Sequence, residues 1–472
     1  MKNEFEREAV LVWTDEILAV QEIVQELPED IYIVGGAVRD AYRRAPIHDL
    51  DLATSGSGLK VARALANRLG GAFYPLDEER DVGRAIIRMN TPTLQGNLTI
   101  DVSRFRVGTL LDDLRDRDFT INAMAVDFKQ DALNIVIDPT GGLDDLAAKI
   151  LRPCSPEALT NDPIRAMRAV RYAISLGMRI KSESSQLIIA AAPGLANVSR
   201  ERVRDELFKI LSLGKPRTAL ILADLLGVMR AAVPDASPLS AEQKTLMQRT
   251  AEQVYQFALA ASPNRTDETA ARFGLGMFVI ALDRFRAPLH AHFSHLWPND
   301  RVHRALMILM VMLGHLSSEL VEENAMDLRL SRAEIDRWLG ALAGMGLVAG
   351  VAKDDVLGAH RFWKATGASG VDAIILHLSR VLCNQDIDLD QDNWLIELER
   401  AQWLFHAYFE AYDRIVEPPV LVTGADLMAA LKLKQGKIIG ELLSAIQEAQ
   451  VTGEVASPED ALTFARRALG DA

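Results

Sequence analysis

Hydrophobic periodicity changes abruptly near residue 150 of this 472-residue chain, and this change constrains the fold more than any other feature. Before it, short apolar or alternating runs typical of β-strands recur between segments with helical spacing. After it, strand patterns nearly vanish, and helical spacing continues to the C-terminus. We therefore predict an α+β fold, in which an N-terminal head built on a mixed sheet is followed by an elongated all-α remainder.

Local patterns predict the elements of the head. An amphipathic helix is expected at Phe5–Glu26, and the short apolar run Ile31–Val34 is typical of a buried strand that meets a Gly-Gly turn. Asp49–Ala53 alternates polar and apolar residues, as a strand with one solvent-facing side does. We predict a sheet of about five strands over residues 30–150, with further strands at Ala85–Met89, Leu98–Ser103, Ala123–Phe128 and Ile135–Asp138, and helices at Ala37–Arg44 and Gly58–Leu69.

Composition narrows the class of protein. The two cysteines, Cys154 and Cys383, are too few for a disulfide framework, so a cytoplasmic protein is expected. No window approaches the ~20 apolar residues of a membrane span, and we expect no membrane partner. The formal net charge of −13 argues against a nucleic-acid partner unless basic residues are concentrated somewhere. They are concentrated, because Leu151–Arg217 holds twelve Lys and Arg against six Asp and Glu.

Gly35-Gly36 and Arg39 precede a pair of carboxylates, Asp49 and Asp51. The glycines let the backbone approach a bulky anion at a helix N-terminus, and arginine can bind a phosphate through two hydrogen bonds. The two aspartates lie two positions apart on a strand and therefore share a face, which is typical of residues that bind Mg²⁺ together. This combination favours nucleotidyl or phosphoryl transfer over the alternative, a turn followed by an edge strand with outward polar residues.

Three further groups of residues could complete such a site. Asp101, on a neighbouring strand, is either a third metal ligand or a surface aspartate paired with Arg104 or Arg106. Arg117-Asp118 lies at the edge of the sheet and could bind ribose and phosphate, although the alternating charges around it also suit a solvated helix. Asn161 or Asp162 could cap a helix that opens at Pro163.

Two helical segments in the basic region carry charged residues at helical spacing. Asp162 and Arg165 project from one face and could read a nucleobase by hydrogen bonding. Arg202 and Glu206 form an i,i+4 pair that could brace the preceding helix and offer a cation to RNA phosphate. A salt-bridged, solvated helix is the alternative for this second segment.

In this order and at these distances, these residues resemble the class II tRNA nucleotidyltransferase and bacterial poly(A) polymerase family, within the polymerase-β nucleotidyltransferase superfamily. The resemblance covers about residues 30–225 and includes the linker Ile137–Leu146. It implies an N-terminal helix and four domains, which we place at 1–29 (helix), 30–150 (head), 151–225 (neck), 226–345 (body) and 346–472 (tail).

The resemblance implies a role for each group of residues. Asp49 and Asp51 resemble the metal-binding catalytic pair, with Mg²⁺ as cofactor. The other implied roles are triphosphate binding by Gly35, Gly36 and Arg39, ribose or nucleotide binding by Arg117, Asp118 and Asn122, base selection by Asp162 and Arg165, and neck support or RNA binding by Arg168, Arg171, Arg200, Arg202, Arg204 and Glu206. The implied activity is addition of CMP and AMP from CTP and ATP to the 3′ end of tRNA.

Two positions depart from the family pattern. Asp116 stands where the family has the first arginine of Arg-Arg-Asp, and Asn161 stands where it has a glutamate. Poly(A) polymerases and enzymes that add only CC or only A share every motif, and they differ in a flexible loop that we expect at Pro75–Arg84. A non-catalytic RNA-binding protein with an inactive head is a further alternative, which the intact Asp49 and Asp51 oppose. The oligomeric state stays open.

The C-terminal half resembles family members that also carry an HD phosphohydrolase domain, because Val422–Met428, Gly436 and Ile439-Gly440 match their tail. The single His-Asp dipeptide, His48-Asp49, lies in the head, however, and His315 stands alone in the region where such a domain binds metal. We therefore expect a degenerate HD-like body without that metal site, and no phosphohydrolase activity from residues 225–345.

Overall fold

The computed structural model describes residues 4–47, 49–236, 238–266, 273–384 and 390–470, so His48 lies outside the described residues. The chain divides into two compact units. The N-terminal unit comprises Met1–Val198 with Leu225–Ala231, and the C-terminal unit comprises Ser199–Asp224 with Ala232–Ala472. Among the described helices, none is long and apolar enough to cross a membrane.

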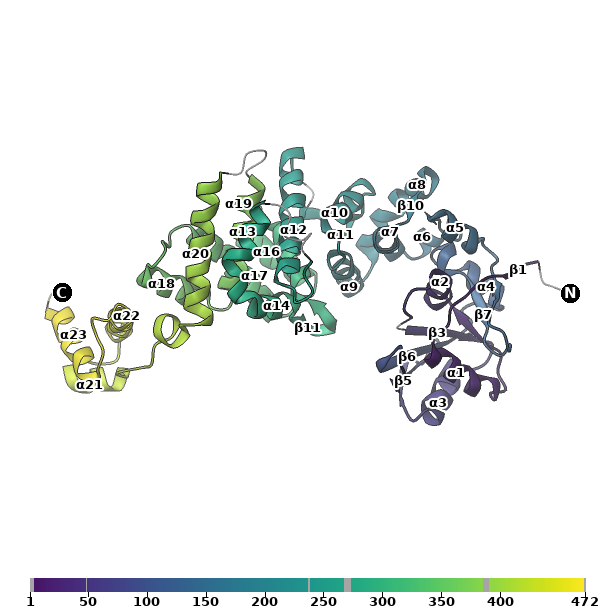
Figure 1. The fold of residues 1–472 in the computed structure, drawn as a ribbon, viewed down its shortest axis with the longest axis horizontal. Helices are drawn as coiled ribbons and strands as arrows, with labels where there is room; N and C mark the ends of the chain where they lie inside the picture. Colours follow the sequence, from purple (N-terminus) through teal and green to yellow (C-terminus); the bar gives the residue numbers. More distant parts are fainter. Residues whose placement is uncertain (1–3, 48, 237, 267–272, 385–389, 471–472) are drawn as a thin grey trace. The chain divides into compact units, whose positions relative to one another are not determined.

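The N-terminal unit is built on an eight-stranded mixed sheet with the order β1-β8-β7-β2-β3-β6-β5-β4 (Figure 1). Strands β3 and β6 pair in parallel, and the other neighbours pair antiparallel. The predicted mixed-sheet head is therefore confirmed. The strands are β1 (Glu6–Glu8), β2 (Ile31–Val34), β3 (Asp49–Thr54), β4 (Ala72–Asp77), β5 (Val82–Asn90), β6 (Gln95–Arg104), β7 (Ala125–Asp127) and β8 (Ile135–Ile137).

Three expectations about the head are wrong in detail. The predicted helix at Phe5–Glu26 begins only at Asp15, and Glu6–Glu8 instead forms β1, which pairs with β8. Strand β4 was not predicted, so the sheet has eight strands where about five were expected. Most of the predicted loop at Pro75–Arg84 belongs to the β4–β5 hairpin, which leaves residues 78–81 as its turn.

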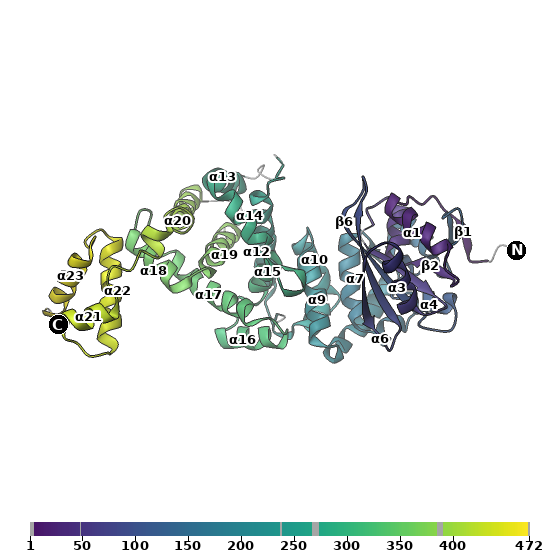
Figure 2. The same cartoon turned by 90° about the horizontal axis from the view of Figure 1, so that it is seen from below.

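The central strands of the sheet sit in the core of the unit. Ile31 and Ile33 of β2 and Leu50 and Leu52 of β3 are buried, as the sequence pattern predicts. Helix α3 packs against β5 and β6, and Figure 2 shows it beside these strands. The helices of this part of the chain are α1 (Asp15–Gln25), α2 (Gly36–Arg43), α3 (Gly58–Arg68) and α4 (Leu110–Arg115).

Beyond the sheet, the described chain is helical apart from four two-residue strands. The N-terminal unit adds α5 (Gly142–Ala148), β9 (Ile150–Leu151), α6 (Ala158–Asn161), α7 (Ile164–Ser175), β10 (Arg179–Ile180) and α8 (Ser182–Ala191). The helix cap proposed at Asn161 or Asp162 is wrong, because Asn161 ends α6 and the residue that caps α7 is Pro163. Pro163 suits this position because its fixed φ angle is already helical.

Helices α9 to α23 follow, with one short hairpin. They are α9 (Arg200–Leu211), α10 (Pro216–Leu225), α11 (Val228–Ala232), α12 (Ala241–Ala261), α13 (Phe273–Leu282), α14 (Arg286–Ser294), β11 (Leu296–Trp297), β12 (Arg301–Val302), α15 (His303–Leu313), α16 (Ser318–Asp327), α17 (Arg332–Val348), α18 (Val356–Thr366), α19 (Ser369–Asn384), α20 (Gln391–Phe409), α21 (Gly424–Leu431), α22 (Lys437–Val451) and α23 (Pro458–Gly470). Trp338, Trp363 and Trp394 are fully buried within these helices.

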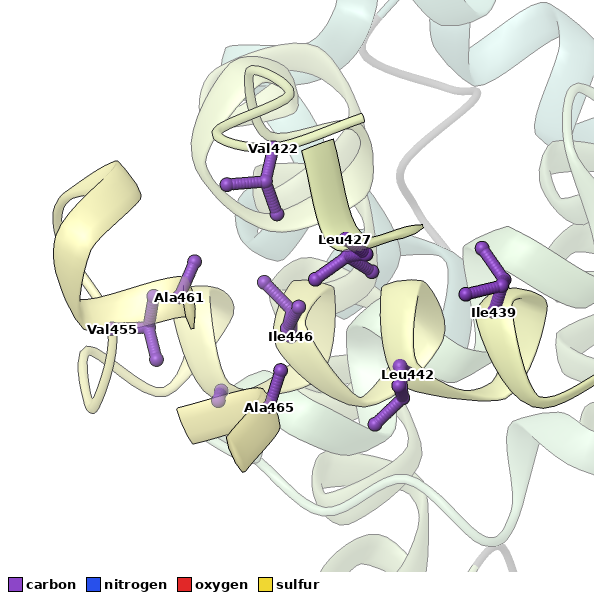
Figure 3. Packing of buried hydrophobic residues seen from close by; sticks show 9 residues of the cluster. Val422, Leu427, Ile439, Leu442, Ile446, Val455, Ala461 and Ala465 are labelled. Atoms are coloured by element: carbon purple, nitrogen blue, oxygen red, sulfur yellow. The ribbon is translucent and has the colours of Figure 1, made fainter. Parts of the chain in front are cut away.

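The last three helices share a core of their own. Leu427 of α21 and Ile446 of α22 point toward one another in Figure 3, and Ala461 and Ala465 of α23 complete the cluster. The buried residues of α22 recur at helical spacing, which is why this segment forms one amphipathic helix.

The predicted neck, 151–225, does not form one body. Residues up to Val198 belong to the N-terminal unit, whereas α9 belongs to the C-terminal unit. The charged residues predicted on these two neck segments are therefore divided between the two units.

Candidate active site

Gly35 forms a tight turn between β2 and α2. Its φ angle is +74°, a left-handed conformation that glycine adopts without strain. A Cβ atom at this position would lie 2.9 Å from Arg117 Nη1 and 3.7 Å from Asp51 Oδ2. Only glycine therefore lets the backbone, the guanidinium and the carboxylate approach one another here.

The predicted pair of carboxylates lies on one face of β3. Asp49 is exposed, and Asp51 is half-buried directly beside Asp101 on the parallel strand β6. Burial raises the pKa of Asp51, and the charges of Asp101 and Asp49 raise it further, while Arg117 opposes them. Carboxylate oxygens are the ligands that hard divalent cations prefer, and such a cation would relieve this repulsion. Asp49 and Asp51 thus fit the divalent metal that nucleotidyltransferases generally use.

Asp101 has a different partner from those considered. Arg84 Nε and Nη2 donate to its two carboxylate oxygens at 2.7 and 2.8 Å. The surface-pair alternative is therefore correct in kind, but the partner is neither Arg104 nor Arg106. The role of Asp101 as a third metal ligand stays a prediction, which would require this ion pair to rearrange.

A cavity of 320 Å³ opens beside the two carboxylates. It brings together most of the predicted site residues, namely Gly35, Gly36, Arg39, Asp49, Asp51, Arg117, Asp118, Asn122, Arg168 and Arg171. Five lining residues were not predicted as site residues, namely Asp40, Pro46, Ile47, Arg106 and Tyr172. Tyr172 could have been found, because it lies seven residues after Arg165 and therefore on the same face of α7.

Arg39 and Arg117 are held by neighbouring side chains. Arg39 Nη1 donates to Asn122 Oδ1 at 2.6 Å, while its Nε and Nη2 pair with Asp40. Arg117 Nη2 donates to Asp113 Oδ2 at 3.3 Å, and the buried Arg117 Nε has no hydrogen-bond partner among the described residues. A donor thus remains for an oxygen of a bound anion.

Asp118 is almost fully buried and lies at the centre of a polar network. Its carboxylate accepts hydrogen bonds from Phe119 N at 2.7 Å and Asn122 Nδ2 at 3.2 Å, and it pairs with Arg168 Nη2 at 2.9 Å. Burial alone would raise the pKa of Asp118, but the charge of Arg168 and these hydrogen bonds outweigh it and hold the pKa below its ordinary value. Asp118 therefore stays ionised and fixes Arg168 beside the cavity.

The predicted base-selecting pair does not line the cavity. Arg165 is buried, and its Nη1 donates to the carbonyl oxygens of Ala158 at 3.0 Å and Arg117 at 3.4 Å. Its Nε lies 4.0 Å from Asp162 Oδ2. The two side chains are thus neighbours, as their spacing predicts, and their role in base selection stays a prediction.

Two of the arginines predicted to support the neck or bind RNA are engaged within the C-terminal unit. Arg204 is buried, and it donates to Asp205 and to the carbonyl oxygen of Arg329, each at 2.8 Å. Arg200 Nη2 pairs with Asp327 at 2.6 Å. A phosphate contact by Arg204 is therefore wrong, because its guanidinium is inaccessible. Glu206 is buried and Arg202 is exposed, and their roles stay predictions.

One further polar cluster lies in the helical body. Asp372 Oδ1 accepts from His303 Nε2 at 2.6 Å and from His292 Nε2 at 2.8 Å. Three metal-ligating atoms thus converge, a juxtaposition that residues 69 to 80 apart in sequence did not indicate. Trp297 Nε1 donates to His303 Nδ1 at 2.9 Å, however. Because tryptophan only donates, the neutral His303 carries its proton on Nε2, and the cluster satisfies itself without an ion.

Comparison with known proteins agrees with this arrangement. The family model "Poly A polymerase head domain" matches residues 31–152. "Probable RNA and SrmB-binding site of polymerase A" matches residues 177–239, and a tRNA nucleotidyltransferase domain 2 model matches residues 411–465.

Relatives match along nearly the whole chain. The CC-adding tRNA nucleotidyltransferase of Geobacter sulfurreducens is 30% identical over 437 residues, which cover 92% of this chain and 90% of that protein. The A-adding tRNA nucleotidyltransferase of Deinococcus radiodurans is 29% identical over 93% of this chain and 96% of that protein. A CCA-adding enzyme solved with CTP has the same fold, with a TM-score of 0.67 and 20% identity over 99% of this chain and 100% of that one. The chain therefore belongs to the tRNA nucleotidyltransferase and poly(A) polymerase family of nucleotidyltransferases.

Proposed function

We propose that this protein transfers CMP or AMP from CTP or ATP to the 3′ end of tRNA and releases pyrophosphate, with Mg²⁺ as its divalent metal. One observation carries the proposal: the paired carboxylates Asp49 and Asp51 open onto a cavity that Arg39, Arg106 and Arg117 also line. A hard cation and a triphosphate are the ligands that suit this combination of charges.

The reaction forms one bond and breaks another. The oxygen of the tRNA 3′ hydroxyl attacks the α-phosphorus of the nucleotide, and the bond from that phosphorus to the bridging oxygen of the β-phosphate breaks. Bound Mg²⁺ would lower the pKa of the hydroxyl and neutralise developing negative charge. Arg39 and Arg117 would hold the triphosphate, and Asp118 and Asn122 would accept and donate hydrogen bonds at the ribose.

Selection of the base would fall to Asp162 and Arg165, without a nucleic-acid template. Arg165 now bonds to two backbone carbonyl oxygens, so reading a base would require its remaining donors or a small rearrangement on nucleotide binding. A bidentate contact to the correct base gives ~1–3 kcal/mol of discrimination.

Partial addition is a specific form of this proposal. The two whole-length relatives carry the names CC-adding and A-adding, and neither name describes addition of the complete CCA sequence. We therefore expect this chain to perform one part of CCA addition. Poly(A) synthesis and RNA binding by an inactive head are the remaining alternatives.

Three tRNA transcripts separate these activities. They end before CCA, after the first C, and after CC, and each is incubated with CTP or ATP alone and analysed on a sequencing gel. Addition of two C residues to the first transcript supports CC addition, and a single A on the third supports A addition. A long ladder with ATP would indicate poly(A) synthesis. Absence of any product under conditions where nucleotide and tRNA both bind would support the inactive-head alternative.

A further inference from the structure

We propose that Tyr172 is a positioning residue that assembles the arginines of the cavity into a binding site for the nucleotide phosphates. The inference rests on the proposed nucleotidyl transfer and goes beyond it, because it assigns affinity for the triphosphate to an uncharged side chain. The assigned effect is the same for CTP and ATP.

Tyr172 occupies a fixed position in the wall of the cavity. It lies in α7 and is 8% exposed. Its ring meets the fully buried Phe119 edge to face, with centroids 5.8 Å apart and an interplanar angle of 82°. This contact holds the ring from behind and leaves its polar end beside the charged residues of the site.

The hydroxyl of Tyr172 holds Arg168. Arg168 Nη2 donates to Tyr172 Oη at 2.9 Å and lies 2.9 Å from Asp118 Oδ2. One nitrogen is thus shared between a neutral oxygen and an anionic oxygen. With only the aspartate as acceptor, this guanidinium could rotate about the ion pair, and the second acceptor fixes its orientation.

The ring of Tyr172 collects three cations. The Cζ atoms of Arg171, Arg168 and Arg39 lie 4.3, 5.6 and 5.7 Å from its centroid. Guanidinium groups gathered in one cavity repel one another until an anion binds. The negative faces of an aromatic ring offset part of that repulsion, and each such contact contributes about 0.5–1 kcal/mol when exposed. Tyr172 therefore keeps the three side chains together before the nucleotide arrives.

The consequence concerns affinity more than the chemical step. The arginines that Tyr172 holds carry positive charge, which binds phosphate, and they differ from the pair predicted to read the base. A loosened set of arginines must be ordered again when nucleotide binds, and this lowers the affinity for any nucleoside triphosphate equally.

Two variants and a matched control test the inference. Tyr172→Phe removes the hydroxyl alone, and Tyr172→Leu also removes the ring. Tyr255→Phe is the control, because Arg304 stacks 5.0 Å from the Tyr255 ring in the same way, outside the cavity. The full-length protein is titrated calorimetrically with non-hydrolysable CTP and ATP analogues in Mg²⁺, and KM and kcat are measured with tRNA.

We expect Tyr172→Phe to raise the Kd of both analogues about 3–10-fold and to raise the KM of CTP and ATP by the same factor, with kcat within about twofold. Tyr172→Leu should raise them about tenfold more than the control does. Equal Kd values for Tyr172→Phe and the wild type would overturn the inference, as would a change confined to one nucleotide. Analogue binding is measured without tRNA, so the inference can hold even if tRNA extension fails, and the reverse.

Discussion

Replacing Asp51 with asparagine should make the metal-free protein more stable while abolishing transfer. Asp51 lies directly beside Asp101 in the parallel register of β3 and β6. Burial and the charges of Asp101 and Asp49 raise its pKa, so the ionised carboxylate opposes folding at neutral pH. Asparagine keeps the shape of the side chain and removes the charge, so the fold loses a repulsion without gaining a cavity.

The size of the gain follows from the sheet register. Like charges at adjacent cross-strand positions destabilise a sheet by about 0.2–1 kcal/mol. Arg84 already neutralises part of the charge on Asp101, which places the expected gain in the lower half of that range. A raised pKa means that wild-type Asp51 takes up a proton as pH falls. The advantage of the variant is therefore complete above that raised pKa and vanishes as pH falls toward the ordinary value of about 4.

Chemical denaturation in EDTA and in MgCl₂ measures this effect. In EDTA at pH 7.5, Asp51→Asn should have the higher free energy of unfolding. Added Mg²⁺ should stabilise the wild type by binding its folded state and should leave the variant unchanged. A variant that is destabilised in EDTA, or that keeps substantial Mg²⁺-dependent activity, would refute the assignment of Asp51 to the metal site.

Three further predictions follow from individual contacts. Arg165→Ala should weaken discrimination among the four nucleoside triphosphates more than it weakens tRNA affinity, and unchanged nucleotide preference in competition assays would contradict the base-selection role. Arg204→Ala should lower the free energy of unfolding by about 1–3 kcal/mol by leaving a buried carbonyl unpaired, whereas Arg202→Ala at an exposed position should have less than half that effect in parallel denaturation curves. His303→Ala should destabilise the protein by about 3–5 kcal/mol because it leaves Asp372 buried without its partner, and equal melting of the variant and the wild type would exclude this network as a structural element.

Much of the head could be predicted from the sequence, because its elements carry strong local signals. The apolar run Ile31–Val34 forms β2 with the predicted bounds, and the alternating run from Asp49 forms β3. Gly35 adopts the left-handed turn that the pattern indicates. By contrast, β1 is only three residues long and reads Glu-Arg-Glu, so its pairing with β8 is a property of the folded sheet alone.

Partners distant in sequence account for most of the errors in the candidate site. The spacing of charges predicted a solvent-facing Arg204, yet its guanidinium bonds to the carbonyl oxygen of Arg329, 125 residues away. Likewise, Asp101 pairs with Arg84 across β5 and β6, at a position that strand register decides. Short-range patterns identify which residue types a site needs, but tertiary packing decides which of them reach it.

The central claim is nucleotidyl transfer at Asp49 and Asp51, and the most direct measurement follows both products of one reaction. The full-length protein is incubated with Mg²⁺, tRNA transcripts lacking all or part of CCA, and α-labelled CTP or ATP, and label in the RNA is counted together with released pyrophosphate. We predict one pyrophosphate for each labelled nucleotide with the wild type, and neither product with Asp49→Asn. Labelled RNA formed by Asp49→Asn at the wild-type rate, or a wild type that binds both substrates and forms neither product, would contradict the account.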